Sequence, residues 1–140
     1  MPVECYQERG RIDEAIRLVQ QVREAAPHKA PTVSLCELLC LQSEWHEVIE
    51  LAAGTSNSDD IDLQILIYYG SALSKVGRDD AALVVYKEAL KSTKRDQELL
   101  WWARYRRAVA HLRLGSKARA RADFVRIYAD AAQQLAALGT

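Results

Sequence analysis

Two cysteines and three histidines are the side chains of this sequence best suited to metal binding or nucleophilic chemistry. Cys36 and Cys40 lie one helical turn apart, a spacing that could supply two ligands to a metal ion. A structural zinc site needs four ligands, and the nearest histidine, His46, follows a predicted turn and belongs to another helix. We therefore predict no metal site and interpret both cysteines as small side chains packed in the core.

The remaining polar residues show no catalytic arrangement. His28, His46 and His111 lie in three separate parts of the chain, and no serine, cysteine or carboxylate pair joins them in a recognised motif. A phosphate-binding loop needs glycines clustered after a strand, whereas Gly70 and Gly77 lie within and after a predicted helix. The sequence therefore predicts a protein that is not an enzyme and binds no cofactor.

The composition is typical of a soluble globular protein. The chain has 140 residues, 49% hydrophobic and 27% charged, and this length suits one domain. No run of about 18 apolar residues is present, so we predict no membrane-spanning helix. The acidic start is not typical of a secretory signal, and three cysteines are too few for a disulfide scaffold. These features favour the cytoplasm, and the Ala- and Arg-rich composition is compatible with a GC-rich bacterial genome.

The net charge of zero conceals an uneven distribution. Residues 1–86 carry 7 Lys and Arg against 14 Asp and Glu, whereas residues 87–126 carry 12 against 4. Such opposite ends can steer partners of either sign or favour head-to-tail stacking of copies. In the basic segment arginines alternate with Trp101, Trp102 and Tyr105, as on some nucleic-acid surfaces, but arginines on the outer side of a helix also keep a protein soluble. Because the whole chain is neutral, nucleic-acid binding is disfavoured and stays an alternative.

Apolar residues recur at intervals of three and four, which predicts an all-helical chain. Ile12, Ala15, Ile16, Val19 and Val22 form one such stripe, and no segment alternates with the period of two typical of strands. The predicted helices cover 2–9, 12–26, 32–42, 45–54, 60–76, 79–93, 96–114 and 117–137. The predicted N-cap residues are Thr32, Asp60, Asp96 and Ser116. The polar linker 54–60 is expected to be the most flexible connection.

Four short turns repeat along the chain at nearly equal intervals. They are marked by Gly10, Ser43, Gly77 and Gly115, so the period is about 34 residues, and the last interval is slightly longer than the others. An apolar residue follows each turn after five residues, and another follows four residues later. Glycine can end a helix in the left-handed conformation without a steric penalty. Each unit is therefore predicted to be a helix, a tight turn and a second helix.

This pattern resembles the tetratricopeptide repeat, in which W-x2-L-G-x2-Y is followed by A-x3-F and a proline within one period of similar length. The third unit matches best, through Leu66, Tyr69, Gly70, Leu73, Ala82 and Tyr86. Pro27 ends the first unit where the family places its proline. In the fourth unit Ala120 and Phe124 match, while Arg104 and Arg107 replace apolar residues.

The resemblance implies an all-α fold: a right-handed α-solenoid of about 3.5 helix-turn-helix repeats in one domain over residues 1–140. The units would cover about 1–28, 29–60, 61–95 and 96–140, with a long C-terminal capping helix. The first unit would lack most of its leading helix. That end, and the apolar side of the last helix, could meet a partner or a second copy, so homo-oligomerisation as a scaffold is an alternative function.

In the family, the first helix of each unit lines a concave groove that holds a segment of a partner. The second unit offers Val33, Glu37 and Cys40. The groove positions of the later units are Gln64, Ile67, Ser71, Lys75, Trp102, Tyr105, Arg106, Val109 and Arg113. Members that hold a terminal carboxylate use lysine, asparagine and arginine, but the single asparagine here, Asn57, lies in the linker. We therefore expect a non-enzymatic interaction module, part of a larger assembly or chain, that binds a peptide or helix with apolar and acidic residues.

Overall fold

The structure is a computed structural model that describes residues 3–25 and 29–139, with side chains from residue 8 onward. Pro27 and His28 lie outside the described residues. The described part contains helices and no strand, which confirms the predicted all-α class. Its seven helices are α1 (Val3–Ala25), α2 (Lys29–Leu41), α3 (Trp45–Ala52), α4 (Asp60–Lys75), α5 (Asp79–Ala89), α6 (Gln97–Arg113) and α7 (Lys117–Leu138). None of these helices has both the length and the hydropathy needed to cross a bilayer.

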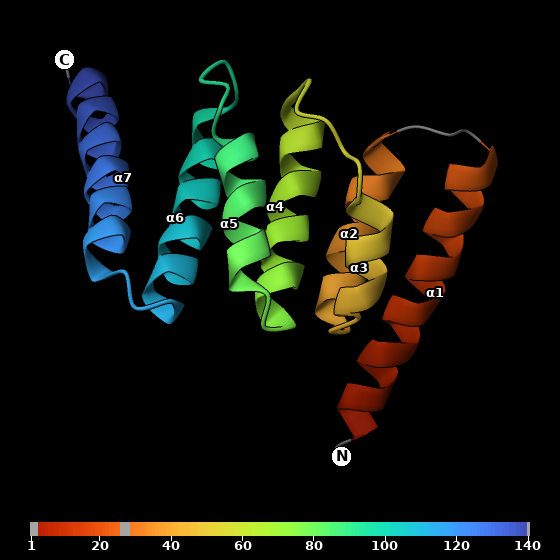
Figure 1. The fold of residues 1–140 in the computed structure, drawn as a ribbon. Coiled ribbons are helices and arrows are strands. Elements are labelled where there is room, and N and C mark those ends of the chain that lie inside the picture. The colour runs from red at the N-terminus through yellow and green to blue at the C-terminus, as the bar shows by residue number, and fades with distance from the viewer. Residues whose placement is uncertain (1–2, 26–28, 140) are drawn as a thin grey trace.

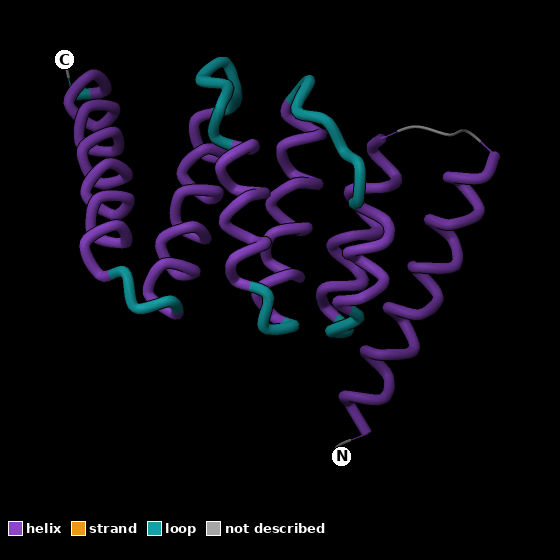
Figure 2. Tube along the Cα trace, viewed as in Figure 1, coloured by secondary structure: helices purple, strands orange, loops and turns teal. Residues whose placement is uncertain are grey.

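The helices lie in one row, with α1 and α7 at its two ends (Figure 1). The turns after α2, α4 and α6 gather at one edge of the row, and the loops after α3 and α5 gather at the other (Figure 2). Helices α2, α4 and α6 contact one another in succession, and α3 and α5 each pack against the even-numbered helix before and after. Among the described residues no two odd-numbered helices contact each other. The even-numbered helices therefore form a continuous layer, against which the odd-numbered ones are spaced apart.

Three predicted turns share one geometry. Ser43, Gly77 and Gly115 adopt the left-handed conformation, with φ of 58°, 83° and 80°. In each turn the next N–H donates to the carbonyl five residues earlier, as from Arg78 to Leu73 at 2.8 Å and from Ser116 to His111 at 2.8 Å. This is the Schellman pattern of helix ends. It confirms the predicted turns at these three positions, including the one without glycine.

The predicted break at Gly10 is wrong. Gly10 lies inside α1, which runs without interruption from Val3 to Ala25. Glycine lowers helix stability by about 1 kcal/mol relative to alanine, a penalty too small to stop a helix whose neighbours are good helix formers. The stub helix and the first turn of the repeat are therefore absent, and the regular pairs begin at α2.

Two of the four predicted N-caps are displaced. Asp59, not Asp60, caps α4 and accepts a hydrogen bond from the N–H of Asp62 at 2.8 Å. Thr32 lies within α2, because that helix begins at Lys29. Asp96 caps α6 through the N–H of Leu99 at 3.2 Å, as predicted. Ser116 occupies the N-cap position of α7 without a side-chain hydrogen bond.

The core consists of two apolar clusters that meet on α4. One joins α2, α3 and α4, and the other joins α4, α5 and α6. In the second cluster the ring of Tyr86 lies directly over Gly70, and Tyr86 is 1% exposed. The repeat residues Val48, Ala82 and Ala120 are buried as well. The small residues of the pattern therefore stand where helices approach closely.

The linker 54–60, predicted from its polar composition to be the most flexible connection, is held by hydrogen bonds at several points. The side-chain amide of Asn57 donates to the last carbonyls of α5, those of Glu88 at 3.0 Å and Ala89 at 3.1 Å. Arg95 in turn donates to the side chain and the carbonyl of Asn57. Asn57 thus satisfies helix-end carbonyls that have no partner within the helix, and it joins two inter-helix loops at one edge of the row.

Asp62 is a buried charge at the start of α4. Its carboxylate accepts from the N–H of Ser58 at 2.9 Å, from Ser56 at 3.1 Å and from Lys29 of α2 at 3.2 Å. Burial raises the pKa of Asp62, but these hydrogen bonds outweigh it and the pKa is lowered. The carboxylate therefore stays ionised and ties α2, the linker and α4 together.

Ion pairs hold α7 against α6. Arg107 makes a two-pronged contact with Asp123, at 2.9 Å from Nε and 2.5 Å from the second nitrogen, and Asp123 is 5% exposed. Arg104 lies 3.6 Å from Asp130. The two arginines that depart from the repeat pattern therefore have carboxylate partners on the last helix. Ion pairs therefore add to apolar packing in holding α6 and α7 together.

His111 makes this part of the fold sensitive to acid. It lies on α6, its Nδ1 atom is buried without a hydrogen-bond partner among the described residues, and burial lowers its pKa from the usual 6.5. The unfolded chain then binds the proton at higher pH than the folded chain does. We expect the free energy of unfolding to fall as the pH drops from about 7 to about 5, the range in which histidine titrates.

Urea unfolding at several pH values measures this fall. A His111→Gln variant should lose most of the slope, whereas His46→Gln, which changes an exposed histidine of α3, should keep it. An unchanged slope in His111→Gln would contradict the assignment. Protonation of Asp59 and Asp62 affects stability only at lower pH, because the pKa values of both carboxyl groups are lowered from 3.8.

Candidate functional site

The candidate site is the face of the even-numbered layer that the odd-numbered helices leave uncovered. We call it the inner face and define it by half-buried or exposed side chains of α2, α4 and α6: Glu37, Cys40, Gln64, Tyr68, Ser71, Lys75, Trp102, Arg106 and Val109. Electrostatic interactions run across it. Glu37 and Cys40 of α2 act on Tyr68 of α4, and Arg106 of α6 acts on Cys40.

An aromatic pair lies at the centre of the inner face. The rings of Tyr68 and Trp102 meet edge to face, with centroids 5.4 Å apart and planes at 87°. Such pairs add about 1 kcal/mol beyond their buried area and fix the position of both rings. Burial, with a contribution from Glu37, raises the pKa of Tyr68 to about 12. The hydroxyl therefore stays protonated and can donate to a ligand.

The structure corrects one predicted groove residue. Ile67 is fully buried in the core and has no surface for a partner. Positions 64, 68, 71 and 75 form the outward stripe of α4, at intervals of four, three and four, so the register of the prediction is wrong by one residue at this point. Tyr68 takes the place assigned to Ile67. The signal for it was the ring itself, since tyrosine tolerates a half-exposed position better than isoleucine does.

Arg106 is a cation without an anion. Among the described residues Arg104, Arg107, Arg113 and Arg126 each pair with an aspartate, whereas no carboxylate pairs with Arg106. Its Nε atom is buried without a hydrogen-bond partner, and its guanidinium carbon lies 6.0 Å from the ring centroid of Tyr105. The other N–H groups of this guanidinium can donate to a carboxylate without first breaking an ion pair.

The other predicted groove residues differ in their surroundings. Lys75 lies 5.9 Å from the ring centroid of Trp45, and Ser71 is 3.4 Å from the hydroxyl of Tyr86. Arg113 is used internally, since it contacts the carbonyl of Ser74 at 3.3 Å and Asp79 at 4.0 Å.

Gln64 and Val109 are half-buried on the inner face. Tyr105 lies towards the other flank of α6, and the centroid of its ring is 5.9 Å from that of Phe124 of α7. The structure therefore gathers Tyr68, Trp102 and Arg106 and places Tyr105 and Arg113 at the margin.

The two cysteines of α2 are not reactive. Cys36 is fully buried, and burial raises its pKa to about 12. Burial likewise raises the pKa of Cys40 to about 11. Both side chains are protonated thiols at neutral pH, and thiols in this form are poor nucleophiles. Among the described residues no three His, Cys, Asp or Glu side chains come together in a group that could hold a metal ion.

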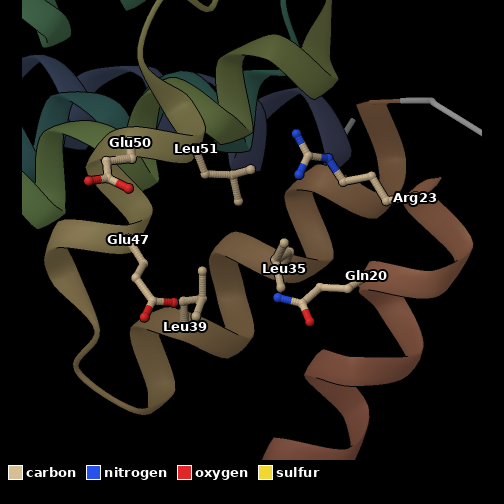
Figure 3. A pocket seen from close by; sticks show the side chains of 7 residues that line it. All are labelled: Gln20, Arg23, Leu35, Leu39, Glu47, Glu50 and Leu51. Carbon is tan, nitrogen blue, oxygen red and sulfur yellow. The ribbon is translucent and has the colours of Figure 1, made fainter.

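A separate hollow of about 510 Å³ lies between α1, α2 and α3. Figure 3 shows Leu35, Leu39 and Leu51 within it, with Arg23 of α1 on one side and Glu47 and Glu50 of α3 on the other. The hollow lies between α1 and α3, which do not contact each other among the described residues. The hollow combines leucines with one arginine and two glutamates, and this mixture of charges indicates no particular class of ligand. The inner face therefore remains the candidate site.

No family model, curated protein or solved structure matches this chain. Its site is consequently characterised by its own geometry: an aromatic pair and an unpaired guanidinium on a layer of three packed helices.

Proposed function

We propose that this chain is a non-enzymatic protein-interaction module of the tetratricopeptide type, in which α2, α4 and α6 line a groove for a peptide or helix of a partner. The observation that carries the proposal is Arg106, a half-buried guanidinium without a carboxylate beside the Tyr68–Trp102 pair. Aromatic and arginine side chains are the most frequent anchors of protein interfaces. The preferred partner segment places an acidic side chain next to an apolar one.

The repeat assignment is supported by the turns and the layering. The three turns at Ser43, Gly77 and Gly115 have the same hydrogen bonds and recur at similar intervals, and the helices alternate between a continuous and a spaced layer. Because neighbouring helices already hold the inner face in place, binding requires little ordering of the module itself.

A displayed library of random peptides tests the proposal. We expect the wild-type chain to enrich peptides that carry an acidic residue near an aromatic or aliphatic one. Arg106→Ala should weaken a selected peptide about tenfold or more, since a hydrogen bond to a charged group contributes roughly 1.5–3 kcal/mol. Arg106→Glu should reverse the selection from acidic to basic peptides.

Arg126→Glu is the matched control, because it reverses an exposed charge on α7, away from the inner face. It should leave the selection unchanged. Trp102→Ala should weaken every selected peptide while far-ultraviolet circular dichroism retains its helical signal. Selection that ignores the charge at residue 106 would remove the inner face as the site.

Nucleic-acid binding through residues 87–126 is less well supported. Four of its twelve basic residues are already paired with aspartates, namely Arg104, Arg107, Arg113 and Arg126. Phosphate contacts would have to compete with these pairs. Binding to RNA or DNA that falls steeply with salt would favour this alternative.

A further inference from the structure

The last two helices share an exposed apolar face. We call it the C-terminal apolar face and define it by Tyr105 of α6 and Val125, Tyr128 and Leu135 of α7, which are 48%, 58%, 78% and 70% exposed. Intervals of three and seven residues place the α7 side chains on one side of that helix. Tyr105 joins them through its ring contact with Phe124, one turn before Tyr128. Covering these large apolar side chains with another surface would remove them from water, which is favourable.

The position of this face follows from the packing of the row. Helix α4 packs against α2 and α3, and α6 packs against α4 and α5. The corresponding place beside α6 and α7 is open among the described residues, and α7 lies at the end of the row (Figure 1). The C-terminal apolar face is therefore suited to a helix, the element that fills each earlier place of this kind.

The charges along α7 favour a second copy of this helix as the occupant of that place. Its N-terminal half carries Lys117, Arg119, Arg121 and Arg126, with no acidic residue in the first turn. The one carboxylate of this half, Asp123, is already paired with Arg107 of α6. Residues 131–138 carry no charge, and the last turn has no basic residue to offset the partial negative charge of the terminal carbonyls. Two copies of α7 packed antiparallel place the basic half of each beside the carbonyl end of the other. Parallel packing would instead bring the two basic halves together.

We propose that two copies of this chain pair through their C-terminal apolar faces, with the two α7 helices antiparallel. A two-fold axis then relates the same residues on both sides, which is the commonest arrangement of homodimers. Val125 of one copy lies near Leu135 of the other, and Tyr128 lies near the axis. The inner faces of both copies stay free, so the dimer presents two peptide-binding faces and its avidity exceeds that of one chain. This inference does not depend on the peptide specificity proposed for the inner face.

Sedimentation equilibrium of the full chain at several concentrations tests the pairing. We expect the mass to rise with concentration from 15.8 kDa towards twice that value. The double variant Tyr128→Glu and Leu135→Glu should remain at 15.8 kDa throughout and keep its helical circular dichroism, because both side chains are exposed. Val84→Glu is the matched control, since Val84 is an exposed apolar residue of α5 outside this face, and it should dimerise like the wild type.

The orientation has its own test. Ala136→Glu places an acidic charge near the end of α7, where the antiparallel arrangement brings the basic half of the other copy. We expect it to strengthen the dimer and Ala136→Lys to weaken it. A weaker dimer in Ala136→Glu would overturn the antiparallel arrangement. A monomer at every concentration, or a dimer that tolerates the double variant, would overturn the interface. The double variant should select the same peptides but bind them with the avidity of a single chain, which separates this proposal from the one for the inner face.

Discussion

Replacing Gly70 with alanine should destabilise the fold by about 3 kcal/mol, the range expected for an overpacked core. A Cβ atom at this position would lie 2.6 Å from Cζ of the Tyr86 ring and closer still to Cε1. These positions are far inside contact distance, and Tyr86 is 1% exposed, so its ring has no free space to enter. Either the ring or the whole of α5 must move away from α4. Urea unfolding followed by circular dichroism measures the loss.

The same substitution at Gly10 provides a control of opposite sign. Gly10 lies in the middle of α1, and a Cβ atom there meets nothing within 4 Å. Alanine should therefore stabilise the helix by about 1 kcal/mol. A second control, Tyr86→Leu in the Gly70→Ala background, should recover part of the loss by shortening the side chain that clashes. If Gly70→Ala were as stable as the wild type, the close packing of α4 and α5 would be incorrect.

Arg107→Met should cost about 3 kcal/mol, because it leaves the carboxylate of Asp123 buried without its partner. Asp123 is 5% exposed, and both of its oxygens accept from Arg107. Arg104 also interacts electrostatically with Asp123, but the two hydrogen bonds come from Arg107, so the loss should concentrate at the contact of α6 with α7. Thermal or urea unfolding measures it, and hydrogen exchange should show α7 as the segment that opens first.

Two further variants separate charge from packing at this contact. Arg107→Met combined with Asp123→Leu removes both charges and should regain most of the stability, since a buried ion pair replaced by apolar side chains is often neutral or stabilising. Arg126→Met breaks an exposed pair with Asp130 and should cost less than about 1 kcal/mol. Equal losses in Arg107→Met and Arg126→Met would mean that burial of Asp123 is unimportant.

The sequence predicted the helix pairs well from α2 onward, because turn chemistry is local. A residue that adopts positive φ, followed by an N–H that reaches back five residues, is determined by a few neighbouring residues, and Ser43, Gly77 and Gly115 all behave this way. Gly10 has the same residue type as two of them but a different outcome. At Gly10 the neighbours on both sides are good helix formers, and the penalty of about 1 kcal/mol for glycine does not end the helix.

The inner face was predicted only in part, because its register depends on packing. The helical period placed positions 64, 71 and 75 of α4 on the outward stripe, but Ile67 and Tyr68 are adjacent and either fits the period. Which of the two is buried follows from the position of α6, whose Trp102 contacts Tyr68.

Partners far apart in the chain were beyond the reach of the sequence pattern. Arg104 and Arg107 departed from the apolar repeat with no visible reason until α7 placed aspartates beside them. The local sequence predicts only a flexible linker around Asn57, because the hydrogen-bond partners of Asn57 lie more than 30 residues away. Contacts of this kind depend on how whole helices are placed, which local propensities do not encode.

The order of contacts along the row has a consequence for how the chain reaches this fold. In the part of the chain that the structure describes, every helix contacts only helices that lie one or two places away in chain order. Native contacts therefore stay within neighbouring helices of the chain, and helical proteins whose contacts are local in this sense fold in microseconds to milliseconds. A growing chain can complete each pair of helices before the next has been synthesised, so an early helix need not wait, exposed, for a distant partner.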